Sequence, residues 1–237
     1  MQLFRADLHV HSCLSPCAEL DMTPSRLLRR AQERGLHMVA IADHNSAENL
    51  PAAQKVARQL GISLIPALEI TTREEVHVLA LFETLSAAER LQERIYASLP
   101  LDTQGAEHQV LVNEHEEVLG FCPRALLSAT QMGLKEAVAE VHRLGGLAVA
   151  SHAEREGFGV LGVLGFLPPD VPFDALEVLS PSVAQELSSQ GHVCLQGSDA
   201  HHLRDIGTRC SLLRLRGPTF RELALALRRA QGRAVLR

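Results

Sequence analysis

Tryptophan is absent from this 237-residue chain, and its other aromatic residues are one Tyr and seven Phe. So few rings argue against base stacking on an aromatic platform, although Phe121, Phe158 or Phe166 could provide one. No apolar run is long enough to span a bilayer, and the first residues lack a basic segment followed by an apolar stretch. We therefore expect a soluble protein without a signal peptide, working in the cytoplasm and not at a membrane.

Cysteine, lysine and net positive charge are also scarce. The five cysteines are odd in number and scattered, which is typical of a reducing compartment rather than a disulfide framework. Lysine occurs only at positions 55 and 135. The formal net charge of -5 gives no overall basic footprint, so any contact with nucleic acid must rest on a local patch. No Gly-x-x-x-x-Gly-Lys sequence is present, which leaves a P-loop nucleotide site unsupported.

Short apolar runs rich in β-branched residues alternate with helical patterns along almost the whole chain. Near-continuous apolar strands between helices are typical of a parallel sheet covered on both faces. The pattern predicts an α/β fold of about seven units, a (β/α) barrel or a distorted relative, in preference to an open doubly wound sheet. We expect residues 1–237 to form a single domain, with an inserted hairpin-like segment near 99–131 and a long loop at 154–172. The expected strands are 4–10, 38–42, 62–68, 76–82, 147–150, 175–179 and 193–196.

At six of these strands we single out a His, Asp or Glu as a candidate ligand, in most cases where the strand ends. The first carries the pair His9-x-His11, whose side chains share one face because alternate residues of a strand do. His77 lies inside its apolar run, not at the end. Any one of these residues could be an ordinary polar strand end, but six of them would not follow the strand period by chance. Because strand ends converge on one face of a barrel, we expect one cluster, formed by His9, His11, His44, Glu69, His77, His152, Asp199 and His201.

Imidazole nitrogens and carboxylate oxygens without a set of thiolates suit zinc, manganese or iron. The donors outnumber the ligands of one ion, so two or three divalent metal ions are expected. Glu69 and Asp199 are natural bridging groups, since a carboxylate can use both of its oxygens. Closely spaced ions activate water and hold the oxygens of a phosphoryl group. Such chemistry needs no side-chain nucleophile, and none stands out in the sequence.

These residues resemble, in the same order, the successive motifs of the PHP (polymerase and histidinol phosphatase) superfamily. The resemblance covers about four-fifths of the chain and is carried by Asp7-Leu8-His9-Val10-His11-Ser12, Ala42-Asp43-His44-Asn45, Glu69, His77, His152 and Ser198-Asp199-Ala200-His201. It implies a distorted (β/α)7 barrel with a trinuclear metal centre at the carboxyl ends of the strands, and phosphoesterase activity. The chain looks most similar to stand-alone, TrpH-like bacterial members that resemble nucleoside and oligonucleotide phosphatases.

The resemblance also implies a distribution of ligands over three ions. One ion would be held by His9, His11, Glu69 and Asp199, a second by Glu69, His77 and His152, and a third by His44 and His201. The chain departs from the family pattern at the remaining ligand of the third ion, which falls near Cys17, with Asp21 a little beyond. A Cys17 thiolate would favour zinc and Asp21 would leave manganese or iron open; we favour Cys17.

Phosphate oxygens also need cationic partners. Arg155, three residues after His152, is expected to reach them from the loop, and His202 and Arg73 are further candidates. Asp7 and Asp43 are expected to orient neighbouring His side chains or backbone, as carboxylates next to metal ligands often do.

The expected substrate is a nucleotide, a short nucleic acid or a phosphorylated metabolite, and histidinol phosphate stays open within the same superfamily. A second hypothesis is an amidohydrolase-type barrel, which also opens with His-x-His. Many of its members use a carbamylated Lys as the bridge between metals, whereas Lys55 and Lys135 both fall within expected helices. A third is a non-catalytic module, which the nearly complete set of ligand positions argues against.

Overall fold

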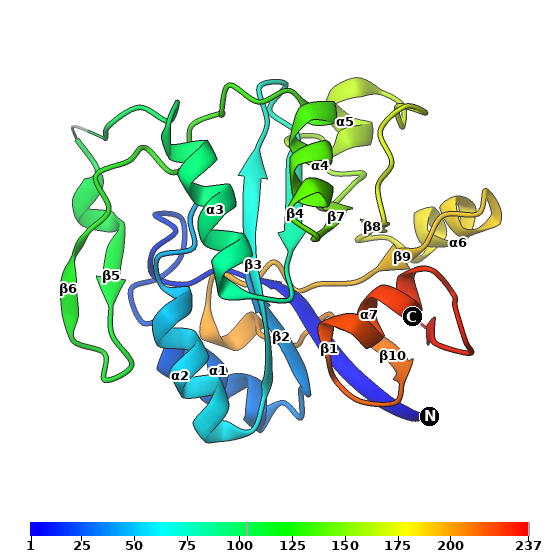
Figure 1. Ribbon diagram of the computed structural model, residues 1–237, viewed down its shortest axis with the longest axis horizontal. Helices are drawn as coiled ribbons and strands as arrows, with labels where there is room; N and C mark the ends of the chain where they lie inside the picture. Colours follow the sequence, from blue (N-terminus) through cyan, green and yellow to red (C-terminus); the bar gives the residue numbers. More distant parts are fainter. Residues whose placement is uncertain (103, 237) are drawn as a thin grey trace.

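The computed structural model describes residues 1–102 and 104–236. Nine strands form one mixed sheet in the order β11-β10-β1-β2-β3-β4-β7-β8-β9. The sheet curls into a nearly closed barrel, because the segment after β9 returns to β1 through a parallel bridge between Ala200 and Val10 (Figure 1). The strands are β1 (Gln2–Val10), β2 (Met38–Ile41), β3 (Ser63–Thr71), β4 (His77–Leu81), β7 (Leu147–Ala150), β8 (Ala175–Glu177), β9 (Cys194–Leu195), β10 (Ser211–Leu215) and β11 (Ala234–Val235).

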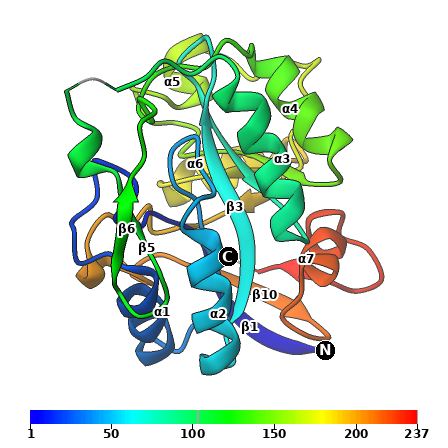
Figure 2. The same cartoon turned by 60° about the vertical axis from the view of Figure 1, so that its left-hand side comes forward.

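Helices cover the outside of this sheet (Figure 2). They are α1 (Pro24–Glu33), α2 (Leu50–Leu60), α3 (Leu85–Tyr96), α4 (Leu134–Arg143), α5 (Val160–Leu164), α6 (Pro181–Ser189) and α7 (Phe220–Leu227), with 3-10 turns η1 (Ala106–His108) and η2 (Leu203–Asp205). Local sequence fixes their ends: Thr23 caps α1 by accepting a hydrogen bond from Arg26 N, and Gly61 ends α2 in the left-handed conformation. The predicted α/β barrel is confirmed. No helix of the described residues is long and apolar enough to cross a membrane.

The expectation of a parallel sheet is wrong for strand β4. β1, β2 and β3 run parallel, as do β7, β8 and β9, but β4 is antiparallel to both β3 and β7. The connection from Thr71 to His77 is too short for a crossover helix and closes as a tight turn, in which Thr72 N donates to Val76 O. The first residue of β4, His77, therefore pairs with the last residue of β3, Thr71.

Alternate residues of the strands point into two apolar layers. Met38 and Ala40 of β2 face an inner layer that also holds Leu223 of α7, whereas Val39 and Ile41 face an outer layer shared with α1–α4. Both faces of the strands are thus buried, which explains why their sequences read as continuous apolar runs. Strands β10 and β11, which the sequence pattern did not indicate, extend the sheet beyond β1: β10 pairs antiparallel with β1, and β11 pairs antiparallel with β10.

The segment 99–131 lies beside α1 and α2 and contains an antiparallel hairpin, β5 (Val110–Val112) and β6 (Val118–Phe121) (Figure 1). Asn49 at the start of α2 fastens the hairpin, because its side chain donates to Val110 O and accepts from Val112 N. Residues 154–172 are not entirely loop, since they include α5.

Candidate metal centre

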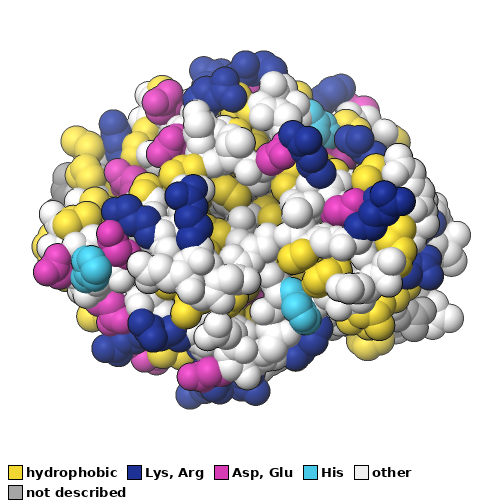
Figure 3. Space-filling view, turned by 60° about the horizontal axis from the view of Figure 1, so that its bottom comes forward, with side chains coloured by type: hydrophobic (Ala, Val, Ile, Leu, Met, Phe, Trp, Pro, Cys, Tyr) yellow, Lys and Arg dark blue, Asp and Glu magenta, His cyan; other side chains and the backbone are white. Residues whose placement is uncertain are grey.

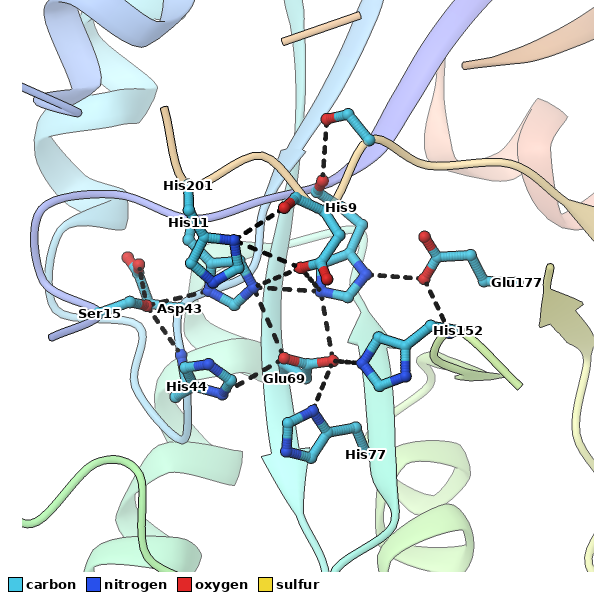
Figure 4. A network of polar contacts seen from close by, with 12 residues as sticks. His9, His11, Ser15, Asp43, His44, Glu69, His77, His152, Glu177 and His201 are labelled. Carbon is cyan, nitrogen blue, oxygen red and sulfur yellow. Dashed lines mark hydrogen bonds and ion pairs between the residues drawn. The ribbon is translucent and has the colours of Figure 1, made fainter. Parts of the chain in front are cut away.

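Six histidines and two carboxylates converge at one end of the barrel (Figure 4). Most come from the carboxyl ends of parallel strands, or from the residues just after them. The exception is His77, which reaches the same place from the start of β4 because that strand is inverted. Six of the eight are buried, and Asp199 and His201 are half-buried. The members are His9, His11, His44, Glu69, His77, His152, Asp199 and His201.

Glu69 lies at the centre of the cluster. Its Oε1 is 3.2 Å from His9 Nε2, 3.2 Å from His77 Nδ1 and 3.4 Å from His152 Nε2. Its Oε2 is 3.3 Å from His44 Nδ1 and 3.6 Å from His11 Nε2. Burial opposes the charge of this carboxyl, but the neighbouring His77 and His9 hold its pKa well below the usual range. Glu69 is therefore a carboxylate with both oxygens aimed at imidazole nitrogens.

Asp199 supplies the second carboxylate. Its Oδ1 is 3.2 Å from His11 Nε2 and 3.6 Å from His9 Nε2, and its Oδ2 is 3.0 Å from Arg155 Nη1. Burial again raises the pKa of Asp199, but His9 and His11 outweigh it and lower the pKa below the ordinary value. The backbone is left-handed at Asp199, with φ 51°, and at His152, with φ 30°. Such strained positions cluster at functional sites.

In three of the rings the nitrogen Nδ1 is occupied by a partner within the protein. His9 Nδ1 lies 2.7 Å from Glu177 Oε2, and His201 Nδ1 lies 2.8 Å from Asp199 O. His11 Nδ1 lies 3.0 Å from Ser15 Oγ, which in turn donates to Asp43. With Nδ1 donating in each case, Nε2 is left free to bind a metal ion, and in His9 and His11 it faces Glu69. Metal-ligating histidines are usually held in this way.

Asp7 and Asp43 act on the backbone and on hydroxyl groups, as expected. Asp43 accepts hydrogen bonds from Ser12 N, Ser12 Oγ and Ser15 Oγ. Asp7 accepts from Ser198 N, Ser198 Oγ and Gly207 N, and so ties β1 to the segment that carries Asp199.

The chemistry of this donor set fits divalent metal ions. His44 Nδ1, His77 Nδ1 and Glu69 Oε1 are buried and, although both nitrogens lie close to a Glu69 oxygen, none of the three atoms makes a hydrogen bond of normal geometry with a described residue. Buried polar atoms without partners are costly unless something else satisfies them. Within the described chain, three groups have donor atoms within 4.8 Å of one another: His9, His11 and Asp199; His44, Glu69 and His77; and His11, His44 and His201. The first two groups overlap the sets implied for the first and second ions, but His44 takes the place of His152 beside Glu69 and His77.

Of the remaining predicted site residues, some line the pocket beside the cluster and others lie elsewhere. A pocket of about 260 Å³ opens onto the cluster, and Cys17 and Arg155 line it together with Leu127 and Phe158. Asp21 lies in a different pocket, beside Cys13 and Arg26, because the chain turns back there and Cys13 N donates to Met22 O.

His202 and Arg73 are not brought to the cluster. His202 does not line the pocket of the cluster, and its Nδ1 lies 2.8 Å from Glu19 Oε1. Arg73 is exposed and pairs with Glu74. Of the cationic candidates, only Arg155 therefore lines the pocket.

Glu177 is the important side chain that the sequence reasoning missed. It is 2 % exposed at the end of β8 and contacts both His9 Nδ1 and His152 N. A charge inside the apolar run Ala175-Leu176-Glu177-Val178-Leu179 was the available signal, since a buried carboxylate needs a partner. Ser15, which links His11 to Asp43, carried no comparable signal.

Both lysines are remote from the cluster. Lys55 lies on α2 and pairs with Glu114, and Lys135 lies on α4 and pairs with Asp170. Both side chains are exposed. A carbamylated lysine bridge is therefore excluded, and Glu69 is the carboxylate at the centre of the cluster.

A nearly closed α/β barrel with His, Asp and Glu side chains gathered at its strand ends is typical of metal-dependent barrel proteins. Within that class, the model of the PHP domain matches residues 7–195, and the chain belongs to this family. The resemblance carried by the sequence motifs is thereby confirmed.

Two curated relatives match about a third of the chain. One is a 5'-3' exoribonuclease from Haemophilus influenzae, 33% identical over 78 residues, which are 32% of this chain and 27% of the relative. The other is a phosphoribosyl 1,2-cyclic phosphate 1,2-diphosphodiesterase from Eggerthella lenta, 30% identical over 80 residues, or 32% of this chain and 29% of the relative. The matches span less than a third of the length of either relative.

Solved structures share the fold over much more of the chain. A lesion-specific endonuclease from Pyrococcus furiosus has a TM-score of 0.77 at 19% identity, covering 99% of this chain and 58% of the endonuclease. An amidohydrolase from Chromobacterium violaceum has a TM-score of 0.59 at 20% identity, covering 86% of this chain and 90% of the other. At these identities the likeness shows the fold.

Proposed function

We propose that this protein is a metal-dependent phosphoesterase that hydrolyses a phosphate ester of a nucleotide, a short oligonucleotide or a phosphorylated metabolite with an activated water molecule. The observation that carries the proposal is the buried set of imidazoles around Glu69, with Arg155 at the mouth of the same pocket. Two or three zinc, manganese or iron ions would be held by the eight clustered donors, with Cys17 as a further ligand at the rim.

The side chains of the cluster and those behind it are proposed to have different roles. The imidazoles and carboxylates hold the ions, and Glu177, Ser15 and Asp43 keep His9 and His11 in the tautomer that presents Nε2. When bound, divalent ions at such donors lower the pKa of water and neutralise phosphate oxygens. No side chain needs to form a covalent bond with the substrate.

Arg155 is proposed to bind the phosphate. Its Nη1 contacts Asp199 Oδ2, but about half of the side chain, 51 %, stays exposed at the pocket rim. The guanidinium has further N–H donors in a flat fork that matches phosphate oxygens. Arg155 is therefore placed to hold a phosphoryl group against the donor cluster, while also orienting Asp199.

The names of the relatives favour phosphodiesters of nucleic acids over histidinol phosphate. An exoribonuclease, a cyclic phosphate diesterase and a lesion-specific endonuclease all cleave phosphodiester bonds. On the face drawn in Figure 3, basic and acidic side chains are interspersed and form no broad basic area. Contacts to a nucleic-acid backbone are thus proposed at the pocket rim, by Arg155, and not across that face.

The test is a substrate panel with metal analysis. Protein loaded with zinc or manganese is offered phosphomonoesters including histidinol phosphate, 3',5'-bisphosphates, short RNAs and a set of cyclic amides, and bound metal is measured by mass spectrometry. We expect hydrolysis of phosphate esters, lost by at least 100-fold in His9→Ala, and unchanged in the control His115→Ala, whose side chain is exposed. Hydrolysis of amides alone would indicate the amidohydrolase, and a metal-loaded protein without any turnover would indicate a non-catalytic module.

A further inference from the structure

Phe158 stands at the mouth of the pocket beside the donor cluster. Its ring stacks on His77, with ring centroids 4.4 Å apart and planes at 19°. One side of the ring is covered in this way, yet 42 % of the residue remains exposed, and it lines the pocket. A single exposed apolar residue is ordinary on a protein surface, but this one is a flat ring held next to the catalytic donors.

The backbone at Phe158 adopts an energetically unfavourable conformation. The residue adopts a left-handed φ of 67°, which bulky side chains rarely do. Its carbonyl oxygen accepts a hydrogen bond from His77 N at 2.8 Å. Strain of this kind persists only where the surroundings impose it, and it concentrates at ligand sites.

Two glycines allow the same segment to pack closely against the backbone that follows β7. A Cβ on Gly159 would lie 2.5 Å from Arg155 O and 2.6 Å from His152 O, and a Cβ on Gly162 would lie 2.0 Å from Arg155 O. Only glycine allows this close approach. The tight segment therefore fixes two groups of different chemistry on one rim, the guanidinium of Arg155 and the ring of Phe158.

We propose that Phe158 is the stacking platform for the nucleobase adjoining the hydrolysed phosphate. The pocket joins a phosphate-binding part, formed by Arg155 and the donor cluster, to an apolar part formed by Phe158 and Leu127. A nucleoside phosphate has the same two parts. The role of Phe158 rests on the proposed function and narrows its substrate class to phosphorylated nucleosides, either free or at the end of a strand.

The other exposed phenylalanines do not reach this pocket. Phe121 lies on β6 and lines the separate pocket that holds Asp21. Phe166, 58 % exposed, follows α5 and is not among the residues that line the pocket of the donor cluster. Of the three rings that the sequence offered for stacking, the structure brings Phe158 to the site, and Phe166 provides a matched control.

The experiment compares ligands with and without a base. Binding of AMP, ribose 5-phosphate and inorganic phosphate to metal-loaded protein is measured by calorimetry, and short RNAs with a normal or an abasic terminal nucleotide are compared in parallel. Stacking of one base on an aromatic side chain corresponds to a change of about 5- to 150-fold in affinity. For a ring with one face already covered, we expect Phe158→Leu to weaken AMP about 5- to 20-fold and to leave ribose 5-phosphate and phosphate within about twofold. Phe158→Tyr should retain AMP binding, and Phe166→Leu should change nothing.

Several outcomes would overturn this role. Equal weakening of all three ligands by Phe158→Leu, or loss of bound metal, would mean that the ring only supports His77. Wild-type protein that binds AMP no better than ribose 5-phosphate, and normal RNA no better than abasic RNA, would exclude a base site without any variant. A base effect seen only with RNA supports the platform and identifies the strand end as the source of the base.

The proposed phosphoesterase activity and the proposed role of Phe158 can be refuted independently. Hydrolysis of phosphate esters without any preference for a base would leave the phosphoesterase standing and remove the stacking platform. Base-dependent binding without turnover of any ester would keep the platform and remove the proposed activity.

Discussion

Replacing Glu177 with Gln tests whether a charged partner holds the ring of His9. Glu177 Oε2 lies 2.7 Å from His9 Nδ1 and accepts a hydrogen bond from His152 N at 3.3 Å. Gln keeps the shape but loses the charge. The amide NH2 of Gln must replace one of the two carboxylate oxygens. If its oxygen keeps the position of Oε2, the NH2 takes the position of Oε1, where no described residue makes a hydrogen bond. The variant should therefore hold His9 more weakly while the fold is retained.

The magnitude follows from the hydrogen bonds. A bond to a charged group contributes about 1.5–3 kcal/mol and a neutral one about 1 kcal/mol, so the exchange costs about 1–2 kcal/mol. That corresponds to about 5- to 30-fold in metal affinity, which overlaps the about 10- to 100-fold range usual for such partners of metal ligands. We expect the Glu177→Gln variant to bind zinc about tenfold more weakly than the wild type at pH 8.

The loss of metal affinity in the Glu177→Gln variant should depend on pH. Burial lowers the pKa of His9, but Glu177, Glu69 and Asp199 outweigh it and raise the pKa well above the ordinary value of 6.5. Protons therefore compete with metal for His9 as the pH falls. Removing the charge of Glu177 lowers this pKa and weakens the competition. The difference in affinity between variant and wild type should thus be largest at pH 8 and narrow toward pH 6.

The assay is calorimetric titration of metal-free protein with zinc and manganese in the presence of a competing chelator. Glu222→Gln is the matched control, because Glu222 also binds a partner closely, Arg233, in a part of the chain outside the donor cluster. An affinity within twofold of the wild type at pH 8, or an equal fall in the control, would refute the role of Glu177.

Three further changes have defined outcomes. Asp43→Asn should lower the free energy of unfolding by about 2–3 kcal/mol in urea titrations, because this buried carboxylate accepts from Ser12 and Ser15; a change below 0.5 kcal/mol would contradict this account. The hydrogen bonds from Arg233 lower the pKa of Glu222 from 4.5 to about 2. Its contribution to stability is therefore present above pH 4.5 and lost as the pH falls toward 2, and Glu222→Gln should lose less stability across that window than the wild type. Cys17→Ser should reduce zinc per chain, measured by mass spectrometry, whereas Asp21→Asn should not; the reverse result would assign the third ion to Asp21.

Much of the barrel was predictable because its strands are buried on both faces. The runs around Met38–Ile41 and Leu147–Ala150 have no polar residue, and burial of this kind leaves a plain mark in the sequence. The direction of β4 was not predicted correctly, since an apolar run looks the same in either direction. Only the short connection from Thr71 to His77 distinguishes a hairpin from a crossover, and its length was the overlooked signal.

The donor cluster was predictable for a related reason. His9 and Asp199 follow the strand period, so the sequence alone was enough to expect their convergence. The position of Cys17 and Asp21 depends instead on a turn closed by a backbone hydrogen bond between Cys13 and Met22, which no side-chain pattern encodes. The support from Glu177 depends on β8 lying next to β7, a relation set by the whole sheet.

The tie between the first strand and the last part of the barrel has a consequence for biosynthesis. Asp7 accepts hydrogen bonds from residues 191 and 200 positions further along the chain, and β1 pairs with β10. Contacts so distant in sequence cannot form while the later residues are still unmade, and they slow folding because a long loop must close first. His9 and His11 therefore cannot join a complete donor cluster until Asp199 and His201 have been synthesised. Ions that need the complete set of donors would therefore bind late in folding.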